Sequence, residues 1–188
     1  MPKQKITKEM VVDAAFELAK EGGAENVLVK NIAESLGCSV QPIYSYCSNM
    51  EKLKKDVIER ISDYFHQYIA ERVDKDDLFA STGRLYLRLS KEEPGLFRMY
   101  FTGVRSDLNV HSLEELYNTE CNPDVTGYIS RKYNVTEEAA RRVQLNMAIY
   151  NQGIASMNIA SGLQIPIEEL EQQLEEAFIA FLNAAKCG

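Results

Sequence analysis

The sequence has few of the residues that build catalytic, metal or disulfide sites. It has no Trp, only two His, and no CxxC pair among its four widely spaced Cys: Cys38, Cys47, Cys121 and Cys187. Because metal-ligand spacing and a disulfide framework are both missing, reduced thiols are expected. There is no Gly-rich phosphate loop or nucleophile–base pair, and Glu92 and Glu93 are interpreted as a solvated face. The sequence therefore favours a protein that is not an enzyme and binds no metal or cofactor.

Charge is missing from the stretch between Arg142 and Glu168. A membrane span is disfavoured there, because amides such as Gln144 and Asn158 are costly in hydrocarbon. A buried helix in a soluble protein is the better interpretation. The N-terminus is followed by amphipathic sequence, so no signal peptide is expected and the protein is placed in the cytoplasm, without a membrane partner.

An excess of positive charge is also missing. The formal net charge is −7, whereas nucleic-acid-binding domains are usually basic. The charge is distributed unevenly, however: residues 1–56 carry eight basic and eight acidic side chains, and the rest carry 13 basic and 20 acidic ones. Composition therefore permits DNA binding by the N-terminal segment but does not identify it.

Helical periodicity is present along nearly the whole chain. Apolar residues recur at three- and four-residue intervals, and no run alternates as a half-buried strand would. Capping residues mark several starts, among them Thr7, Ser48 with Asn49, Thr136, and Ser112 in a capping box with Glu115. The helices are predicted at 7–22, 29–36, 40–46, from 48 onward, 77–91, 94–101, 112–120, 124–133, 136–161 and 166–185.

Residues 29–46 have the pattern of a helix-turn-helix. Gly37 ends the first helix, and Ser39 is a suitable N-cap for the second. Such a unit presents the N-terminal end of its second helix to base edges in the major groove. Gln41 is suited to adenine, and Val40 or Pro42 to a thymine methyl group. The candidate recognition residues are short or polar and almost uncharged: Ser39, Val40, Gln41, Ser45 and Tyr46.

The stretch IAESLGCSVQPIYSYCSNMEKL, residues 32–53, resembles the signature of TetR-family transcriptional regulators. It has the Ile-Ala pair, the Gly before the turn, the Tyr-x-Tyr helix and the start of the next helix. The resemblance implies an all-α homodimer of about nine helices. Residues 1–48 would form the helix-turn-helix DNA-binding domain, and residues 49–188 the ligand-binding and dimerisation domain. By position it implies phosphate contacts from Tyr44, Tyr46 and Lys52, assisted by Lys30.

Two positions depart from this pattern. Cys47 stands where the family usually has Phe, so the packing of the recognition helix is expected to be looser. Met50 replaces the usual Lys and removes one phosphate contact, although the backbone amides at that helix start remain available. These departures and the acidic charge keep an alternative open. In it, the protein is a TetR-like interaction module, a co-regulator that does not bind DNA directly.

The last two long helices carry the prediction of a homodimer. Helix 136–161 is apolar on more than one side and must be covered from more than one side. A partner chain can cover one of these faces, as in the four-helix interface that the resemblance implies. Burial of both faces within one chain is the alternative. The predicted interface residues are Gly153, Ser156, Ala160, Leu174, Phe178 and Phe181.

Aromatic and sulfur side chains gather in the middle helices. An apolar cavity with a few polar groups is what a small-molecule effector requires, although an aromatic stripe is more often plain core. The amides Asn146, Asn151 and Asn158 are candidates to orient a ligand. The predicted ligand-binding residues are Tyr64, Tyr68, Tyr86, Phe97, Tyr100, Phe101, Tyr117, Met147, Tyr150 and Asn151.

The resemblance also implies how a ligand would act. The effector favours a subunit arrangement in which the two recognition helices no longer match adjacent major grooves, which lie about 34 Å apart along the duplex. The protein is then a repressor of a pseudo-palindromic operator that is released by its ligand. The helix that starts at Ser48 is expected to transmit the change.

Overall fold

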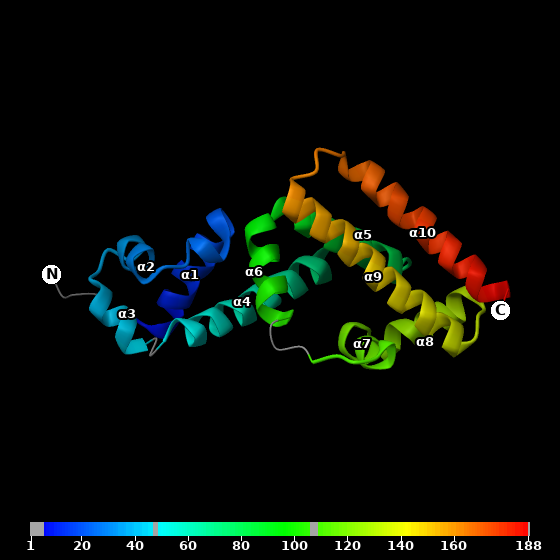
Figure 1. Ribbon diagram of the computed structural model, residues 1–188, viewed down its shortest axis with the longest axis horizontal. Helices are drawn as coiled ribbons and strands as arrows, with labels where there is room; N and C mark the ends of the chain where they lie inside the picture. Colours follow the sequence, from blue (N-terminus) through cyan, green and yellow to red (C-terminus); the bar gives the residue numbers. More distant parts are fainter. Residues whose placement is uncertain (1–5, 47–48, 106–108, 188) are drawn as a thin grey trace. The chain divides into compact units, whose positions relative to one another are not determined.

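The structure is a computed structural model that describes residues 6–46, 49–105 and 109–187 (Figure 1). Within these residues it contains ten α-helices, a single 3-10 turn and no strand. The all-α prediction is therefore confirmed, with as many helices as the ten predicted segments and one more than the nine or so that the resemblance implies. None of the described helices combines the length and the apolar character that a membrane span needs.

The chain divides into two compact units. The first unit holds the described residues up to Glu71 and those from Glu92 to Arg105. The second holds Arg72–Lys91 and the described residues from Asn109 onward. The first unit thus includes most of the long fourth helix, beyond the functional boundary predicted at residues 48 and 49. It does so because that helix packs against the N-terminal helices.

The first unit is built around three short N-terminal helices. Its elements are α1 (Lys8–Gly22), the 3-10 turn η1 (Gly23–Glu25), α2 (Val29–Ser35), α3 (Val40–Tyr46), α4 (Met50–Arg72) and α6 (Pro94–Arg105). The predicted cap of α1 is confirmed, because the Thr7 side chain accepts a hydrogen bond from the Met10 amide at 3.2 Å. Asn49 caps α4 by accepting from the Lys52 amide at 2.7 Å. Cys47 and Ser48 lie outside the described residues.

Complete burial of one face of each helix holds this unit together. Two ion pairs, Lys8 with Asp56 at 2.8 Å and Arg60 with Asp13 at 3.3 Å, join α1 to α4 at the surface. Exposed pairs of this kind contribute little, so the apolar core supplies most of the stability. The largest side chains of this unit with almost no exposure are Val11, Val27, Ile32, Ile43, Leu53, Val57, Ile61, Leu96 and Phe97.

The start of α6 lies directly against the end of α1. A Cβ at Gly95 would stand 2.4 Å from the Ala19 carbonyl oxygen and 3.0 Å from that of Lys20. Only glycine permits this approach. Gly23, which ends α1, has a φ of 75°, a left-handed conformation that also favours glycine. The two glycines therefore fix where α6 meets α1.

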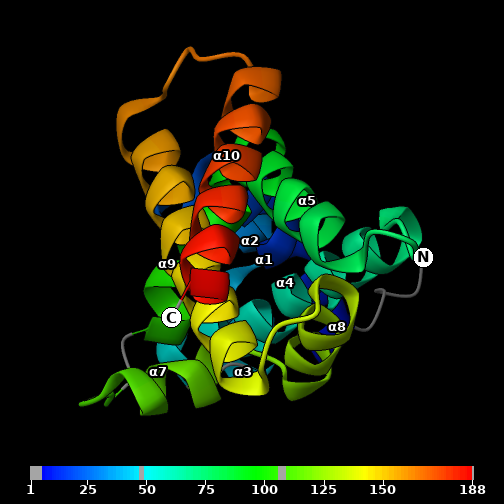
Figure 2. The same cartoon turned by 90° about the vertical axis from the view of Figure 1, so that its right-hand side faces the viewer.

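The second unit is a bundle around one long helix. Its elements are α5 (Leu78–Glu92), α7 (Leu113–Glu120), α8 (Pro123–Tyr133), α9 (Glu137–Ser161) and α10 (Ile167–Cys187). Figures 1 and 2 both show α9 and α10 antiparallel and side by side, as expected after the turn at Gly162. The predicted caps are confirmed, since Ser112 accepts from the Glu115 amide and Thr136 from the Ala139 amide.

Candidate DNA-binding face and ligand pocket

The turn between α2 and α3 has a defined geometry. Gly37 has a φ of 62°. Its amide donates to the Glu34 carbonyl at 3.1 Å, and the Cys38 amide donates to the Ala33 carbonyl at 2.9 Å. This is the Schellman arrangement that commonly ends a helix at glycine. It orients the chain so that α3 follows as the second helix of a helix-turn-helix.

One face of α3 is buried and the opposite face is open to solvent. Ile43 is fully buried, whereas Val40 is 43% and Tyr44 60% exposed. Val40 and Tyr44 are therefore available for contact on this open face. Of the other predicted DNA-binding residues, Ser39, Gln41, Ser45, Lys30 and Lys52 are exposed, and Pro42 and Tyr46 are half-buried.

The aromatic side chains of the first unit form a closed cluster. Phe65 lies 5.4 Å from Tyr100 and 6.0 Å from Phe97 between ring centroids, and Phe97 lies 4.4 Å from Phe101. Phe97 has no exposure, and Phe65 has 6%. Five predicted ligand-binding residues belong to this part of the first unit; Tyr68 and Phe97 are buried, and Tyr64, Tyr100 and Phe101 are half-buried.

Two carboxylates hold the tyrosines of this cluster. Glu93 accepts from Tyr64 at 2.9 Å and pairs with Lys20 at 2.8 Å, and Glu92 accepts from Tyr68 at 2.8 Å. The interpretation of Glu92 and Glu93 as a solvated face was therefore wrong for Glu93, which is only 9% exposed. The error arose because Glu93 precedes α6, and its burial depends on the contact of α6 with α1.

This network changes the acidity of its members. The hydrogen bond and charge of Glu93 raise the pKa of Lys20. Burial, reinforced by Glu93, raises the pKa of Tyr64. Both protons are thus held more tightly in the folded protein than in the unfolded chain.

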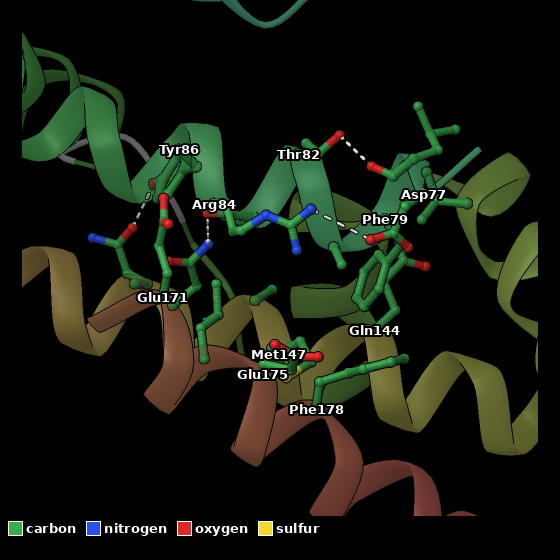
Figure 3. Close-up of a pocket in the computed structure, with 18 of the residues that line it drawn as sticks. Asp77, Phe79, Thr82, Arg84, Tyr86, Gln144, Met147, Glu171, Glu175 and Phe178 are labelled. Atoms are coloured by element: carbon green, nitrogen blue, oxygen red, sulfur yellow. Dashed lines mark hydrogen bonds and ion pairs between the residues drawn. The ribbon is translucent and has the colours of Figure 1, made fainter. Parts of the chain in front are cut away.

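A cavity of about 530 Å³ lies in the second unit, between α5 on one side and α9 and α10 on the other (Figure 3). This volume is within the range of small-molecule sites. Its apolar wall includes Phe79, Met147, Leu174 and Phe178. Phe178 also contacts Phe79 and Tyr133, with ring centroids 5.4 and 5.1 Å apart. The wall is apolar and aromatic, as a site for an organic molecule requires.

Charged side chains line the same cavity. Asp77 pairs with Lys132 at 3.0 Å and with Arg84 at 3.4 Å. Burial opposes ionisation of Asp77, but the bonds and charges of Lys132 and Arg84 outweigh it and lower the pKa of Asp77. Glu171 binds Arg88 through both carboxylate oxygens, at 2.5 and 3.1 Å. Among the described residues no His, Cys, Asp or Glu group is arranged to hold a metal ion.

The predicted ligand-binding residues of the second unit have different positions. Tyr86, Met147 and Asn151 line the cavity. Tyr117 lies outside it, hydrogen-bonded to Thr126, and Tyr150 contacts Phe181 across a ring distance of 6.2 Å. Of the other two candidate amides, Asn146 is exposed, and Asn158 is buried and donates to Ser90 at 3.2 Å.

Sequence reasoning missed the contribution of α10 and of the start of α5. Leu174 and Phe178, which were predicted for the dimer interface, line the cavity and are only 4% and 8% exposed. The amphipathic pattern of α10 shows which face is buried but not that a cavity lies beneath it. Polar residues on the buried side of a helix were the available signal, and Asn151 was found in that way. The main residues missed are Asp77, Phe79, Arg84, Tyr133, Glu171 and Glu175.

The face of α9 that points away from the cavity is apolar and exposed. Ile149 is 48% and Met157 55% exposed. The predicted interface residues Gly153, Ser156 and Ala160 are exposed on this same face, and a Cβ on Gly153 would meet nothing within 4 Å. Phe181 of α10 is half-buried beside Tyr150. We refer to Ile149, Gly153, Ser156, Met157 and Ala160 as the α9 face.

Several solved structures are similar to this chain. A TetR-family transcriptional regulator from Streptomyces coelicolor has 17% identity and a TM-score of 0.70, covering 96% of this chain and 82% of its own. A transcriptional regulator from Rhodococcus sp. Rha1 has 15% identity and a TM-score of 0.62, covering 96% and 98%. A candidate TetR-family regulator from Mesorhizobium loti has 14% identity and a TM-score of 0.52, covering 94% and 95%.

No protein-family model and no curated protein matches the sequence. The structural matches extend over nearly the whole chain, and the predicted resemblance to TetR-family regulators is confirmed at the level of the fold. The chain therefore has the fold of TetR-family transcriptional regulators. At these identities the likeness concerns the fold alone.

Proposed function

We propose that the protein is a cytoplasmic DNA-binding transcriptional regulator, a repressor that binds a pseudo-palindromic operator as a homodimer and releases it when a small molecule occupies the cavity. The observation that carries this proposal is the open face of α3. It presents Val40, Gln41 and Tyr44 to solvent while Ile43 anchors the helix in the core. The fold, shared with transcriptional regulators, supports the same conclusion.

The chemistry of this face suits a major groove. Gln41 can pair with an adenine through two hydrogen bonds, and Val40 can contact a thymine methyl group. Tyr44 and the exposed Lys30 and Lys52 can reach phosphates and position the helix. Because phosphate contacts release counterions, affinity is expected to fall steeply as salt increases.

A homodimer is supported by the α9 face. A monomer rarely leaves residues as large as Ile149 and Met157 about half exposed on the same helix face as several small residues. Small side chains such as Gly153 and Ala160 allow a second helix to approach closely. A two-fold pairing of α9 and α10 would bury this face and give the dimer two copies of α3, as a pseudo-palindromic operator requires.

The chain itself offers a route from the cavity to the DNA-binding helices. α5 lines the cavity with its first half and ends at Glu92, which binds Tyr68. Glu93 follows and binds Lys20 of α1. A ligand that shifts α5 would therefore act on the contacts that hold α1 and α4, and would favour one of two arrangements.

A second candidate function is a TetR-like interaction module that binds another regulator instead of DNA. The net charge of −7 and the presence of Met50 where the resemblance expects a lysine favour it. Selection of duplexes from a random pool distinguishes the two functions. A regulator of the proposed kind enriches a pseudo-palindrome and binds it with sub-micromolar affinity, whereas failure to enrich any sequence supports the interaction module.

Substitutions on α3 then test the proposed interface. Gln41→Ala should weaken binding to the selected duplex by about 5- to 100-fold and relax the preference at one position. The matched control is Gln173→Ala, an exposed glutamine on α10, which should bind like the wild type. Loss of dimerisation in Gln41→Ala, or unchanged DNA affinity, would contradict the assignment of α3 as the recognition helix.

A further inference from the structure

One buried acceptor in the cavity lacks a partner. Asn151 is 8% exposed and lines the cavity from α9. Its side-chain oxygen Oδ1 is the one buried side-chain polar atom of the described residues without a hydrogen bond. Leaving such a group unsatisfied costs about 1–3 kcal/mol, so proteins seldom retain one without a use.

The orientation of this amide is fixed by its neighbour. Asn151 Nδ2 donates to the Gly83 carbonyl oxygen at 3.0 Å. A carbonyl can only accept, so turning the amide over would place two oxygens against each other. The atom that remains for a ligand is therefore the oxygen, and the ligand must supply a donor.

Neighbouring uncharged donors are already used within the chain. Tyr86 donates to Gln152 at 2.6 Å, and Gln152 donates onward to Ser156 at 3.0 Å. Gln144 Nε2 donates to the Asn122 carbonyl at 3.2 Å, and Thr82 to the Leu78 carbonyl at 2.7 Å. Of the charged donors lining the cavity, Arg84 faces the carboxylate of Asp77. Each of these donors thus already has a partner within the protein, whereas the Asn151 oxygen, an acceptor, has none.

The charges of the side chains that line the cavity also favour a positively charged ligand. Four carboxylates, Asp77, Glu120, Glu171 and Glu175, line the cavity against the single guanidinium of Arg84, a net charge of −3. Lys132 and Arg88, which bind Asp77 and Glu171 from outside the lining, offset two of these negative charges. Glu175 has no hydrogen bond or ion pair within the described part of the chain. Figure 3 labels it among the side chains that line the cavity, together with Met147 and Phe178.

We propose that the cavity binds an organic cation that carries at least one N–H donor, with an apolar or aromatic body. The inference rests on the proposed function of the cavity as the effector site and specifies the chemical class of the effector. Its ammonium-type group donates to Asn151 Oδ1 and is attracted by Glu175. Its body lies against Phe79, Met147 and Phe178, where aromatic faces also favour positive charge.

Four probes with the same biphenyl body test this assignment by isothermal titration calorimetry on the full chain without DNA. They are 4-phenylbenzylammonium, its N,N,N-trimethyl derivative, 4-phenylbenzyl alcohol and 4-phenylbenzoate. The first combines charge with N–H donors, and each of the others lacks one or both. The ammonium should bind about 10-fold or more tighter than the alcohol, with the trimethyl cation between them and the carboxylate weakest. A carboxylate that binds as well as the ammonium, equal affinities, or no binding at millimolar concentration would overturn the proposal.

Two variants connect the preference to named groups. Glu175→Gln is on an exposed position and should fold normally; it should weaken the ammonium by about 3- to 10-fold and leave the alcohol unchanged. Glu169→Gln, on the same helix but outside the cavity, is the matched control and should change neither. Asn151→Ala should abolish the advantage of the ammonium over the trimethyl cation. If both variants keep the wild-type order and ratios, the assigned contacts are wrong.

The same probes separate this inference from the proposed function. Preferential binding of the ammonium without any effect on the selected duplex would support the ligand class and contradict ligand-controlled release. Release of the duplex by the carboxylate but not by the ammonium would support the regulator and overturn the ligand class.

Discussion

The two units have interiors of different kinds, although both are rich in aromatic side chains. In the first unit Phe65, Phe97 and Tyr100 pack against one another, and the buried carboxylate of Glu93 is satisfied by Lys20 and Tyr64. In the second, Phe79 and Phe178 line a cavity whose wall also includes Asn151, a buried residue with an unsatisfied amide oxygen. Aromatic content therefore does not distinguish a closed core from a binding site, but unsatisfied polar groups do.

The largest expected difference between these interiors is in the cost of removing a ring. Phe97→Ala should lower the free energy of unfolding by about 3–5 kcal/mol, because a fully enclosed ring leaves a void. Phe178→Ala should cost roughly 2 kcal/mol less, since the ring already borders a cavity and has fewer partners to lose. Urea denaturation at one fixed protein concentration measures both. Equal losses would mean that the cavity wall is packed as tightly as the core.

Substitutions at two helical glycines, one in each unit, should change the free energy of unfolding by smaller amounts. A Cβ at Gly95 would lie 2.4 Å from the Ala19 carbonyl, so Gly95→Ala should destabilise by about 1–3 kcal/mol through forced separation of α6 from α1. A Cβ at Gly83, on the cavity wall, would lie 3.4 Å from Leu174 and 3.6 Å from Asn151. Gly83→Ala should therefore be neutral or stabilising by up to about 1 kcal/mol. Thermal unfolding of the two variants should shift in opposite directions or, at least, only Gly95→Ala should lose stability.

The smallest expected effects, below about 1 kcal/mol, concern pH. In the first unit the raised pKa values of Lys20 and Tyr64 mean that the folded state binds more protons than the unfolded state above about pH 10. This contribution is present at neutral pH and is lost as the pH rises through the folded-state pKa values. Glu93→Gln should make the alkaline decline in stability shallower.

The ion pairs of the cavity affect the stability of the protein at acid pH. The lowered pKa of Asp77 means that the folded state binds fewer protons than the unfolded state below about pH 4. Its contribution is therefore present at neutral pH and is lost as the pH falls through the folded-state pKa. Asp77→Asn should make the acid decline shallower, measured by urea midpoints between pH 2.5 and 5. An unchanged acid limb in this variant would contradict the role of the pairs with Lys132 and Arg84.

Much of the fold could be predicted from the sequence because its determinants are local. Thr7, Ser112 and Thr136 cap helices as predicted, and Gly23 and Gly37 end them. Helical periodicity also agrees with the burial of Ile32, and the structure adds that Ile43 is buried and the opposite face of α3 is open. Backbone propensity, capping and amphipathicity each act within a few residues, so a single sequence contains them.

The cavity could not be predicted in the same way, because it is defined by residues far apart in the chain. Phe79, Asn151 and Phe178 meet only after α5, α9 and α10 have assembled. Tyr64 and Tyr68 are also aromatic residues of a middle helix, but they belong to the first unit, where they donate hydrogen bonds to Glu93 and Glu92. Whether a buried residue faces a neighbour or a cavity depends on this long-range packing. Helical periodicity contains no information about it.

The α9 face provides a further test of the assembly on which operator binding depends. Ile149→Lys should convert the protein from a dimer to a monomer of 21.3 kDa in light scattering. Ile179→Lys is a matched control, since Ile179 is 49% exposed, close to the 48% of Ile149, but borders the cavity on α10. A wild-type protein that is already monomeric at micromolar concentration would remove the basis for a two-fold arrangement.

The most direct measurement of the central claim is the stoichiometry and footprint of the protein on its selected duplex. Native mass spectrometry combined with hydroxyl-radical footprinting should find two chains per duplex, with two protected half-sites about one helical turn, roughly 34 Å, apart. Protection should be weakened at both half-sites by Tyr44→Ala. A single chain per duplex, one unsymmetrical protected patch, or protection unchanged by Tyr44→Ala would contradict the account.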